Sequence, residues 1–317
     1  MTATMQAAAI DRFGSADVIL VRDLPRPAAG PGELLVRVAA AGVQITDAAI
    51  RGGWTPPGAT IAFPQVLGNE FAGVVVDRGP GVDTVEVGDE VVGFRLLGCY
   101  AEFVSVPASQ VVPKPAVMSW AEAGALSASG QTAHTAVEAL RIRAGETVLV
   151  HGAAGGVGSA FVQLAVACGA RVIGTASTQN HDYVRGLGAD EVVIYGDGQR
   201  ERLVDAAPHG IDAALDAAGH DNLHTAVTLV QDRSRIATLV DVDLAGRLGC
   251  RFLRSDRSGQ RLRLLTAAVD AGHLKVHVRR IYDLADAADA HRDVETGHGR
   301  GKAVLVMGEA PAPRTAS

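Results

Sequence analysis

The chain has 317 residues, which is enough for two domains that each bury a core. Its residues are 48% hydrophobic and 20% charged with a net charge of −6, and without a long basic cluster a nucleic-acid partner has no electrostatic support. Charged residues interrupt every long apolar stretch, the first residues lack a signal-peptide pattern, and the three scattered cysteines exclude a disulfide framework. These features predict a globular cytoplasmic protein.

The first part of the chain, to about residue 121, carries short strand-like runs rich in valine. Runs at 34–40, 71–76 and 91–94 are separated by turns of glycine and proline. Short strands between tight turns are typical of a compact, mostly antiparallel barrel. We therefore predict that architecture for the first domain.

From about residue 122, strand-like and helix-like segments alternate. This order predicts a parallel sheet that helices cover on both faces. Beyond the strand that starts at Val148, strands are expected at 171–175, 191–195, 211–215 and 235–240. The remaining segments indicate helices at 257–273 and 284–296 and a last strand at 302–307.

The most informative segment is Val148 to Gly158, which reads VLVHGAAGGVG. It is interpreted as a buried strand, a glycine turn and the start of a helix. Glycines lack a β-carbon and so let backbone amides and a helix N-terminus approach a pyrophosphate. Aligned to G-x-G-x-x-G, the segment has Ala153 at the first glycine position and Gly155 and Gly158 at the other two. Its context predicts a dinucleotide-binding turn.

The helix after this turn is expected to pack one apolar face on the sheet. Apolar residues from Val157 to Cys168 fall at i, i+4, i+7, i+8 and i+11. Cys168 is therefore predicted to be a buried apolar filler, and Gly169 is predicted to end the helix.

The order of a barrel-like part, a dinucleotide fold and a short return resembles the medium-chain dehydrogenase/reductase superfamily. Within it, the chain is similar to the zinc-free quinone oxidoreductases of the zeta-crystallin-like group. The resemblance covers nearly the whole chain. It is carried by five segments in the family's order: AAGVQITDAAIRGG (40–53), VLGNEFAGVV (66–75), VGDEVVGF (87–94), VLVHGAAGGVG (148–158) and GHGRGKAVL (297–305).

The resemblance implies an α/β protein of two domains. A GroES-like antiparallel β-barrel catalytic domain would span 1–121 and be completed by about 266–308. A Rossmann domain with a doubly wound parallel sheet would span 122–265 and bind NADP. The tail at 309–317 is predicted to be disordered.

The resemblance also indicates that no catalytic zinc is held. Zinc-dependent relatives use a cysteine, a histidine and a second cysteine where this chain has Gln44, Asn69 and Ala128. An amide does not replace a thiolate as a zinc ligand, and alanine offers no ligand. His151 follows an apolar strand and is interpreted as a satisfied core histidine rather than a metal ligand.

The end of the second Rossmann strand favours NADPH over NADH. NAD-preferring folds place an acidic side chain there, whereas this chain has a hydroxyl residue, Ser177, that leaves room for a 2′-phosphate. Related NADPH enzymes often place a lysine a few residues beyond, where this chain has neutral Asn180. Arg185 is interpreted either as reaching the phosphate or as facing solvent. Tyr195 either contacts the adenosine end or caps the core.

Further cofactor contacts follow only from family position. The resemblance implies contacts with the diphosphate, the ribose or the nicotinamide from Thr132, Gly155, Gly156, Val157, Gly219, Val240, Asp241, Phe252 and Leu253. For Val240, Phe252 and Leu253 a core or subunit-interface role remains an alternative.

The implied reaction is hydride transfer from NADPH to a quinone or an α,β-unsaturated carbonyl. Conjugation spreads the developing charge onto oxygen, so placement and a few hydrogen-bond donors suffice. Gln44 is the expected donor and Trp54 an aromatic wall for a flat substrate. Asp47 is expected to cap the helical turn that it begins. No side-chain proton donor is evident, so the final proton is assigned to water.

Three other functions compete with this interpretation. The missing ligands argue against a zinc-dependent alcohol dehydrogenase. A non-catalytic NADPH-binding redox sensor would carry the same cofactor residues, and an enoyl-thioester reductase would share the fold. As partners, the sequence predicts a small-molecule substrate and no nucleic acid or membrane. A strand near 249–253 that pairs with a second copy implies a homodimer by resemblance.

Overall fold

The computed structural model describes residues 3–308 and divides into two compact units. Of the described residues, unit 1 holds 3–128, 258–270 and 276–308, and unit 2 holds Ser129–Arg257 and Ala271–Lys275. The predicted division at 121/122 and 265/266 thus differs from these boundaries by less than ten residues. The predicted tail, 309–317, lies outside the described residues.

Unit 1 is built on two sheets. One has the strand order β2-β1-β4, and the other has the order β15-β16-β3-β5-β6-β8, with β7 also paired to β3. All of these pairs are antiparallel except β15 with β16, which confirms a mostly antiparallel first domain. The strands are β1 (Thr4–Ile10), β2 (Ile19–Pro25), β3 (Glu33–Val43), β4 (Gln65–Val66), β5 (Glu70–Arg78), β6 (Glu90–Phe94), β7 (Phe103–Pro107), β8 (Val111–Pro113), β15 (Val278–Asp283) and β16 (Lys302–Val306).

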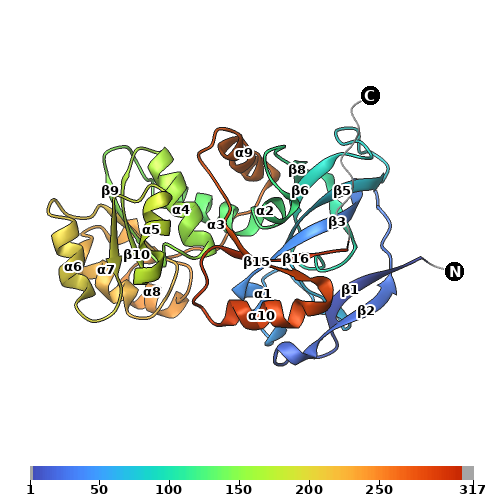
Figure 1. The fold of residues 1–317 in the computed structure, drawn as a ribbon, viewed down its shortest axis with the longest axis horizontal. Coiled ribbons are helices and arrows are strands. Elements are labelled where there is room, and N and C mark those ends of the chain that lie inside the picture. The colour runs from blue at the N-terminus through green and yellow to red at the C-terminus, as the bar shows by residue number, and fades with distance from the viewer. Residues whose placement is uncertain (1–2, 309–317) are drawn as a thin grey trace. The chain divides into compact units, whose positions relative to one another are not determined.

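The C-terminal strand completes the sheet begun by the N-terminal part. Figure 1 shows β16, in red, beside β3, in blue, and the register pairs Val304 with Gly42. The helices of this unit are α1 (Ile45–Arg51), α2 (Trp120–Gly124), α9 (Gly259–Asp270) and α10 (Ala287–Glu295), and it also contains the start of α3 (Ser127–Ala139).

The prediction that the first domain holds all of 266–308 is wrong for Ala271–Lys275, which belong to unit 2, where the Gln163 side chain bonds to the Lys275 backbone. The other two differences from the predicted boundaries also have physical causes. Gly124 of α2 packs so closely on β3 that a β-carbon there would lie 2.6 Å from the Ala40 carbonyl oxygen. At the start of α9, a β-carbon on Gly259 would lie 2.2 Å from the carbonyl oxygen of Ser109. Backbone-to-backbone packing of this kind binds both helices to unit 1.

Unit 2 is a six-stranded parallel sheet in the order β11-β10-β9-β12-β13-β14. Numbered along the chain this is 3-2-1-4-5-6, the doubly wound order of dinucleotide-binding folds, as predicted. The strands are β9 (Thr147–His151), β10 (Arg171–Ala176), β11 (Glu191–Ile194), β12 (Ala213–Asp216), β13 (Ile236–Thr238) and β14 (Arg251–Phe252). Its helices after α3 are α4 (Gly156–Ala167), α5 (His181–Gly186), α6 (Gln199–Ala206), α7 (Asn222–Leu229) and α8 (Val242–Leu248).

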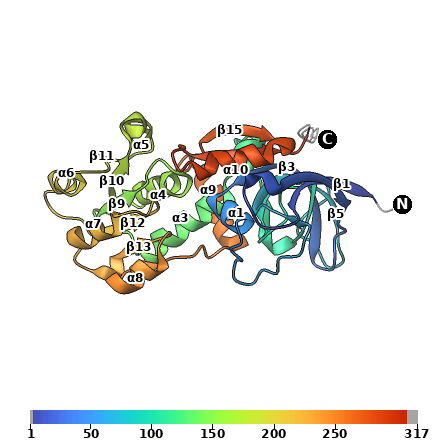
Figure 2. The ribbon, with the colours of Figure 1, turned by 90° about the horizontal axis from the view of Figure 1, so that it is seen from below.

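Helices α6, α7 and α8 cover one face of this sheet. Their apolar side chains form one buried cluster with Leu149, Ile173, Val193, Ala214 and Ile236 of the strands. Figures 1 and 2 show these helices, in yellow to orange, along the sheet. Among residues 3–308, no helix combines the length and the apolar composition that a bilayer crossing requires.

One packing prediction on α4 is wrong. The helix ends at Ala167 and Gly169 adopts a φ of +80°, so the glycine stop is confirmed. Cys168 is exposed rather than buried. Its amide still bonds to the Leu164 carbonyl oxygen, so Cys168 keeps its helical position; at this end of α4 that position is exposed, because burial depends on what packs there and not on the periodicity alone.

Candidate functional site

The glycine turn lies between β9 and α4, where the sequence places it. β9 ends at His151 and α4 begins at Gly156. Gly152 has a φ of +75°, a conformation that residues with a β-carbon rarely adopt. The glycine that this turn requires therefore stands one residue before Ala153, which explains how the chain tolerates alanine at the first motif position.

The two later motif glycines have different roles. A β-carbon on Gly158 would lie 2.1 Å from the carbonyl oxygen of Gly152, so this glycine permits α4 to pack against the turn. A β-carbon on Gly155 would find no atom nearer than the same oxygen at 3.4 Å. Gly155 thus has open space on that side, which fits close approach of a ligand to the backbone.

The switch point of the sheet lies between β9 and β12, because the strand order reverses there. Ligands of such sheets bind beyond the carboxyl ends of the strands at this point. The loop after β12 contains Gly219 at a φ of +78°, and its amide donates a 2.8 Å hydrogen bond to Asp216 Oδ1. A β-carbon on Gly219 would lie 2.9 Å from Val240 Cγ1. The glycine turn, this loop and the 12-residue helix α4 fit a dinucleotide.

The structure brings together the two polar residues predicted to meet the 2′-phosphate. Asn180 is buried, and its Nδ2 donates to Ser177 Oγ at 3.0 Å. Because that bond uses a lone pair of the hydroxyl, the O–H of Ser177 is left to donate elsewhere. Arg185 is half-exposed and contacts Asp182 of the same helix at 3.3 Å, which favours its solvent-facing interpretation.

The exposed fraction of the side chain decides between a cofactor contact and a core role at two other predicted cofactor positions. The side chains of Tyr195 and Val240 are 49% and 53% exposed, so neither is a core residue. Phe252 packs partly against the apolar cluster of unit 2, on the edge strand β14. Thr132 and Val157 are half-buried on α3 and α4, Gly156 is the first residue of α4, and Leu253 follows β14. Asp241 caps α8 by accepting the Leu244 amide at 2.8 Å.

In unit 1, a buried carboxylate organises the residues around Gln44. Glu70 is fully buried; its Oε1 accepts hydrogen bonds from Gln44 Nε2 and, at 3.0 Å, from Lys302 Nζ. Its Oε2 accepts from the Ala128 amide at 2.6 Å. Two of the three positions that hold zinc in relatives, Gln44 and Ala128, therefore contact one carboxylate, and Asn69 precedes it in the chain.

Asp47 caps α1, as predicted, but it does so as the third residue of the helix and does not begin it; it also joins a second buried group. Its Oδ2 accepts the Gln44 amide at 3.0 Å and the Tyr100 hydroxyl at 2.7 Å, and its Oδ1 accepts Asn69 Nδ2 at 2.8 Å. Burial raises the pKa of Asp47 above its usual value despite these donors. The network fixes the backbone from which Gln44 projects.

The donor set around Gln44 does not fit a zinc ion. Gln44 and Asn69 offer amides, Ala128 offers no side-chain ligand, and neither a thiolate nor an imidazole replaces them. Within residues 3–308, no group of three or more His, Cys, Asp or Glu side chains could hold a metal ion.

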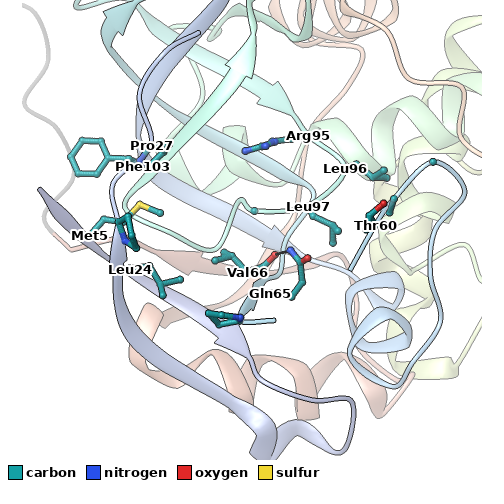
Figure 3. Close-up of a pocket in the computed structure, with 15 residues that line it drawn as sticks. Met5, Leu24, Pro27, Thr60, Gln65, Val66, Arg95, Leu96, Leu97 and Phe103 are labelled. Carbon is teal, nitrogen blue, oxygen red and sulfur yellow. Dashed lines mark hydrogen bonds between the residues drawn. The ribbon is translucent and has the colours of Figure 1, made fainter. Parts of the chain in front are cut away.

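Trp54 follows α1 and is 45% exposed. A pocket of about 570 Å³ in the same unit is lined by apolar side chains, including Met5, Leu24 and Leu97, and by Arg95 (Figure 3). Neither Trp54 nor Gln44 lines this pocket, so it does not join the two predicted catalytic residues.

His151 is a core histidine, but it is only partly satisfied. It is fully buried, and burial lowers its pKa to about 3, so the ring is neutral. Its Nδ1 lies 3.3 Å from Thr175 Oγ1 and 3.4 Å from Gln199 Nε2. Its Nε2 has no hydrogen-bond partner among the described residues. The prediction of a fully satisfied histidine is therefore wrong for one nitrogen.

Comparison with known proteins places the chain in a family. The alcohol dehydrogenase GroES-like domain matches residues 30–116, and the zinc-binding dehydrogenase domain matches residues 187–305. The quinone oxidoreductase of Rattus norvegicus is 30% identical over 96% of this chain and 98% of its own length. The chain belongs to the medium-chain dehydrogenase/reductase superfamily. It is an oxidoreductase of the quinone-oxidoreductase-like group.

Other similar proteins differ from this chain in length, or differ from one another in the cofactor that their descriptions mention. The spectinabilin polyketide synthase system protein NorB of Streptomyces orinoci is 32% identical over 93% of this chain, which spans only 14% of that protein. A mycobacterial protein solved in complex with NADPH is 30% identical, with a TM-score of 0.84 over 96% of this chain and 100% of its own. A structure described as an NAD-dependent alcohol dehydrogenase is 31% identical, with a TM-score of 0.86 and the same coverage.

Sequence reasoning missed the groups that hold Gln44. Glu70 and Lys302 are 232 positions apart and read as ordinary charged residues, yet both are buried and paired. One signal was available: each stands at the first position of an apolar strand, in EFAGVVV and KAVLV. A charge at such a place is rarely buried without a partner.

Proposed function

We propose that the chain is an NADPH-dependent reductase that transfers hydride to a quinone or an α,β-unsaturated carbonyl without a metal. The observation that carries the proposal is the Gln44–Glu70–Lys302 network: Gln44 stands at one of the positions that the resemblance assigns to a zinc ligand, and its amide is held by a carboxylate that is paired with an ammonium. An acceptor that is activated by conjugation does not need a Lewis acid. The bound cofactor supplies the hydride.

In this proposal Gln44 stabilises the oxygen of the acceptor. Its Nε2 has two hydrogens, of which Glu70 accepts one, so the second is left to donate to the developing oxyanion. Lys302 neutralises Glu70, which keeps a full negative charge from opposing that oxyanion. Trp54 stacks on the flat substrate, and water supplies the final proton.

Replacing Gln44 with alanine is expected to lower kcat for a quinone about 100-fold, the usual cost of removing one oxyanion donor. The measurement is NADPH oxidation with 9,10-phenanthrenequinone. Gln6→Ala, which removes a similar side chain from an exposed position on β1, is the matched control and should leave turnover unchanged. Full turnover in Gln44→Ala would remove this residue from the mechanism.

The choice of NADPH is supported by the end of β10. No carboxylate stands at Ser177, and Asn180 orients its hydroxyl so that the O–H can donate to a 2′-phosphate. The known NADPH complex of a similar mycobacterial protein agrees with this choice, although a similar structure is described as NAD-dependent.

Ser177→Asp is therefore expected to weaken NADPH binding at least about tenfold, because a carboxylate repels the 2′-phosphate at short range. NADH, which lacks that phosphate, is the internal control and should bind the variant as well as it binds the original chain. Titration of cofactor fluorescence measures both affinities. Equal specificity constants for NADPH and NADH in the unaltered chain would contradict the assignment of Ser177.

Three outcomes would redirect the proposal. The likeness to a segment of a polyketide synthase protein makes an enoyl-thioester reductase the second candidate, since such synthases work on thioesters. Turnover of crotonyl-coenzyme A without turnover of quinones would select it. NADPH binding without turnover of quinones, enones or thioesters would instead favour a redox sensor, and stoichiometric zinc in the purified protein would overturn the metal-free mechanism.

We further propose a homodimer that forms through β14. This strand is at the edge of the unit 2 sheet, so its outer side can pair with a second copy of itself. Light scattering that gives the mass of one chain would rule this out.

A further inference from the structure

A row of buried polar side chains crosses the sheet of unit 2 at the carboxyl ends of its strands. Thr175 of β10 is paired with His151 of β9, His151 with Asp216 of β12, and Asp216 with Thr238 of β13. Each of the four is at most 2% exposed. Paired residues in a parallel sheet share a face. The row therefore borders the switch point on the face that α6, α7 and α8 cover.

A single amide on α6 connects to this row and to two loops. Gln199 is the first residue of α6 and is buried. Its Oε1 accepts the Gly196 amide at 3.2 Å, in the loop after β11. Its Nε2 lies 3.3 Å from Asn222 Oδ1 and 3.4 Å from His151 Nδ1.

These bonds fix the direction of every donor in the group. Since a backbone amide only donates, the Gln199 atom that faces Gly196 is the carbonyl oxygen, and Nε2 donates. His151 Nδ1 accepts this bond in the tautomer that carries the ring proton on Nε2. Asn222 accepts through Oδ1 and donates through Nδ2 to the Gly219 carbonyl oxygen at 2.6 Å.

Two loops and the end of β9, at the edge where a dinucleotide would bind, thus depend on one side chain. Gln199 reaches the loop after β11 through Gly196, the loop after β12 through Asn222 and Gly219, and the last residue of β9 through His151. The loops after β9 and β12 are the two sides of the switch-point crevice. A change at Gln199 would alter their relative placement without removing any group that touches the ligand.

We propose that Gln199 is a positioning residue for the dinucleotide, which acts by holding the end of β9 and the loops after β11 and β12 in one arrangement. The inference rests on the proposed use of a nicotinamide dinucleotide. Asn222 is the link through which Gln199 sets the Gly219 loop. Neither residue is assigned a contact with the cofactor.

The test compares two buried glutamines whose side chains make the same number of hydrogen bonds at different places in unit 2. Gln199→Leu removes three hydrogen bonds, and we expect it to raise the Kd for NADPH at least about tenfold, which corresponds to the loss of about one to two such bonds. Gln163→Leu is the matched control. Gln163 is equally buried, on α4, and its amide also makes three bonds, to Ser159 and Lys275. Its loss should lower Tm but leave the Kd within twofold.

A second variant keeps the test decisive if Gln199→Leu does not fold. Asn222→Ala removes the two hydrogen bonds that link Gln199 to Gly219 and leaves the other bonds of Gln199 in place. It is expected to weaken the binding of NADPH, while adenosine 2′,5′-bisphosphate, which lacks the nicotinamide half, binds unchanged. A uniform structural defect would weaken both ligands.

The possible results separate the two hypotheses. If the unaltered chain binds neither NADPH nor NADH, the proposed function and this inference both fail. Suppose instead that the unaltered chain binds NADPH. Only the positioning role is then overturned if the folded Gln199→Leu or Asn222→Ala variant binds NADPH as tightly as the unaltered chain does. The same conclusion follows if Gln163→Leu weakens NADPH binding as much as Gln199→Leu.

Discussion

Gly158→Ala is expected to unfold unit 2 at markedly lower urea concentration and to abolish NADPH binding. The new β-carbon would lie 2.1 Å from the Gly152 carbonyl oxygen and 2.9 Å from Ala153 Cα. These neighbours are backbone atoms of the glycine turn and cannot rotate away, so α4 or the turn has to move. Overpacking of this severity costs about 3 kcal/mol. Equilibrium urea unfolding and NADPH titration measure the two effects.

Gly155→Ala is the matched control, since it adds the same methyl group to the same turn. The nearest atom to its β-carbon is 3.4 Å away, and the φ of Gly155, −73°, suits alanine. The variant should unfold within about 0.5 kcal/mol of the unaltered chain but bind NADPH more weakly, because its methyl group obstructs the approach to the pyrophosphate. Equal stabilities of the two variants would contradict the packing role of Gly158.

Lys302→Met is expected to destabilise unit 1 by about 3–5 kcal/mol, the usual cost of breaking a buried ion pair. The side chains of Lys302 and Glu70 are 4% and 0% exposed and lie 3.0 Å apart. Without the ammonium, the carboxylate keeps only neutral donors, Gln44 Nε2 and the Ala128 amide. Urea unfolding measures the loss of stability. A lower kcat should accompany this loss, because Glu70 then carries an uncompensated charge beside Gln44.

The double variant Glu70→Gln/Lys302→Met provides the control within the same site. It removes both charges together, so it should recover most of the stability that Lys302→Met loses. Lys114→Met, which breaks the more exposed pair with Glu90, should cost less. A Lys302→Met protein as stable as the original chain, or a double variant less stable than both single variants, would show that the pair does not stabilise unit 1.

The fold was largely accessible from the sequence because its signals are local. The apolar strand, the glycine turn and the amphipathic helix between 148 and 169 depend on neighbouring residues, and the structure confirms each of them. Local reasoning failed at the end of α4, where Cys168 is exposed although it falls on the apolar pattern. It also could not show that the positive φ of this turn belongs to Gly152, one residue before the first glycine position of the motif.

The candidate site was accessible only in part. Family position indicated Gln44, Asn69 and Ser177, but no pattern indicated what would hold them. Gln199 lies at the start of a helix whose other residues are mostly polar, and nothing in QRERLVDA distinguishes it from a solvated side chain. Its role depends on atoms of His151 and Asn222, 48 and 23 residues away in the chain.

The sequence by itself determined the class of this protein: a β-rich first part, a dinucleotide fold and the loss of the zinc ligands. The first two follow from the spacing of near neighbours, and the third from the residue types at positions that the family resemblance points out. Only the tertiary structure decided which charges are buried and paired, that Asn180 contacts Ser177, and that one glutamine joins two loops and a strand end. Burial and hydrogen-bond geometry depend on chain segments that meet only after folding, and residue type and spacing carry no record of those distances.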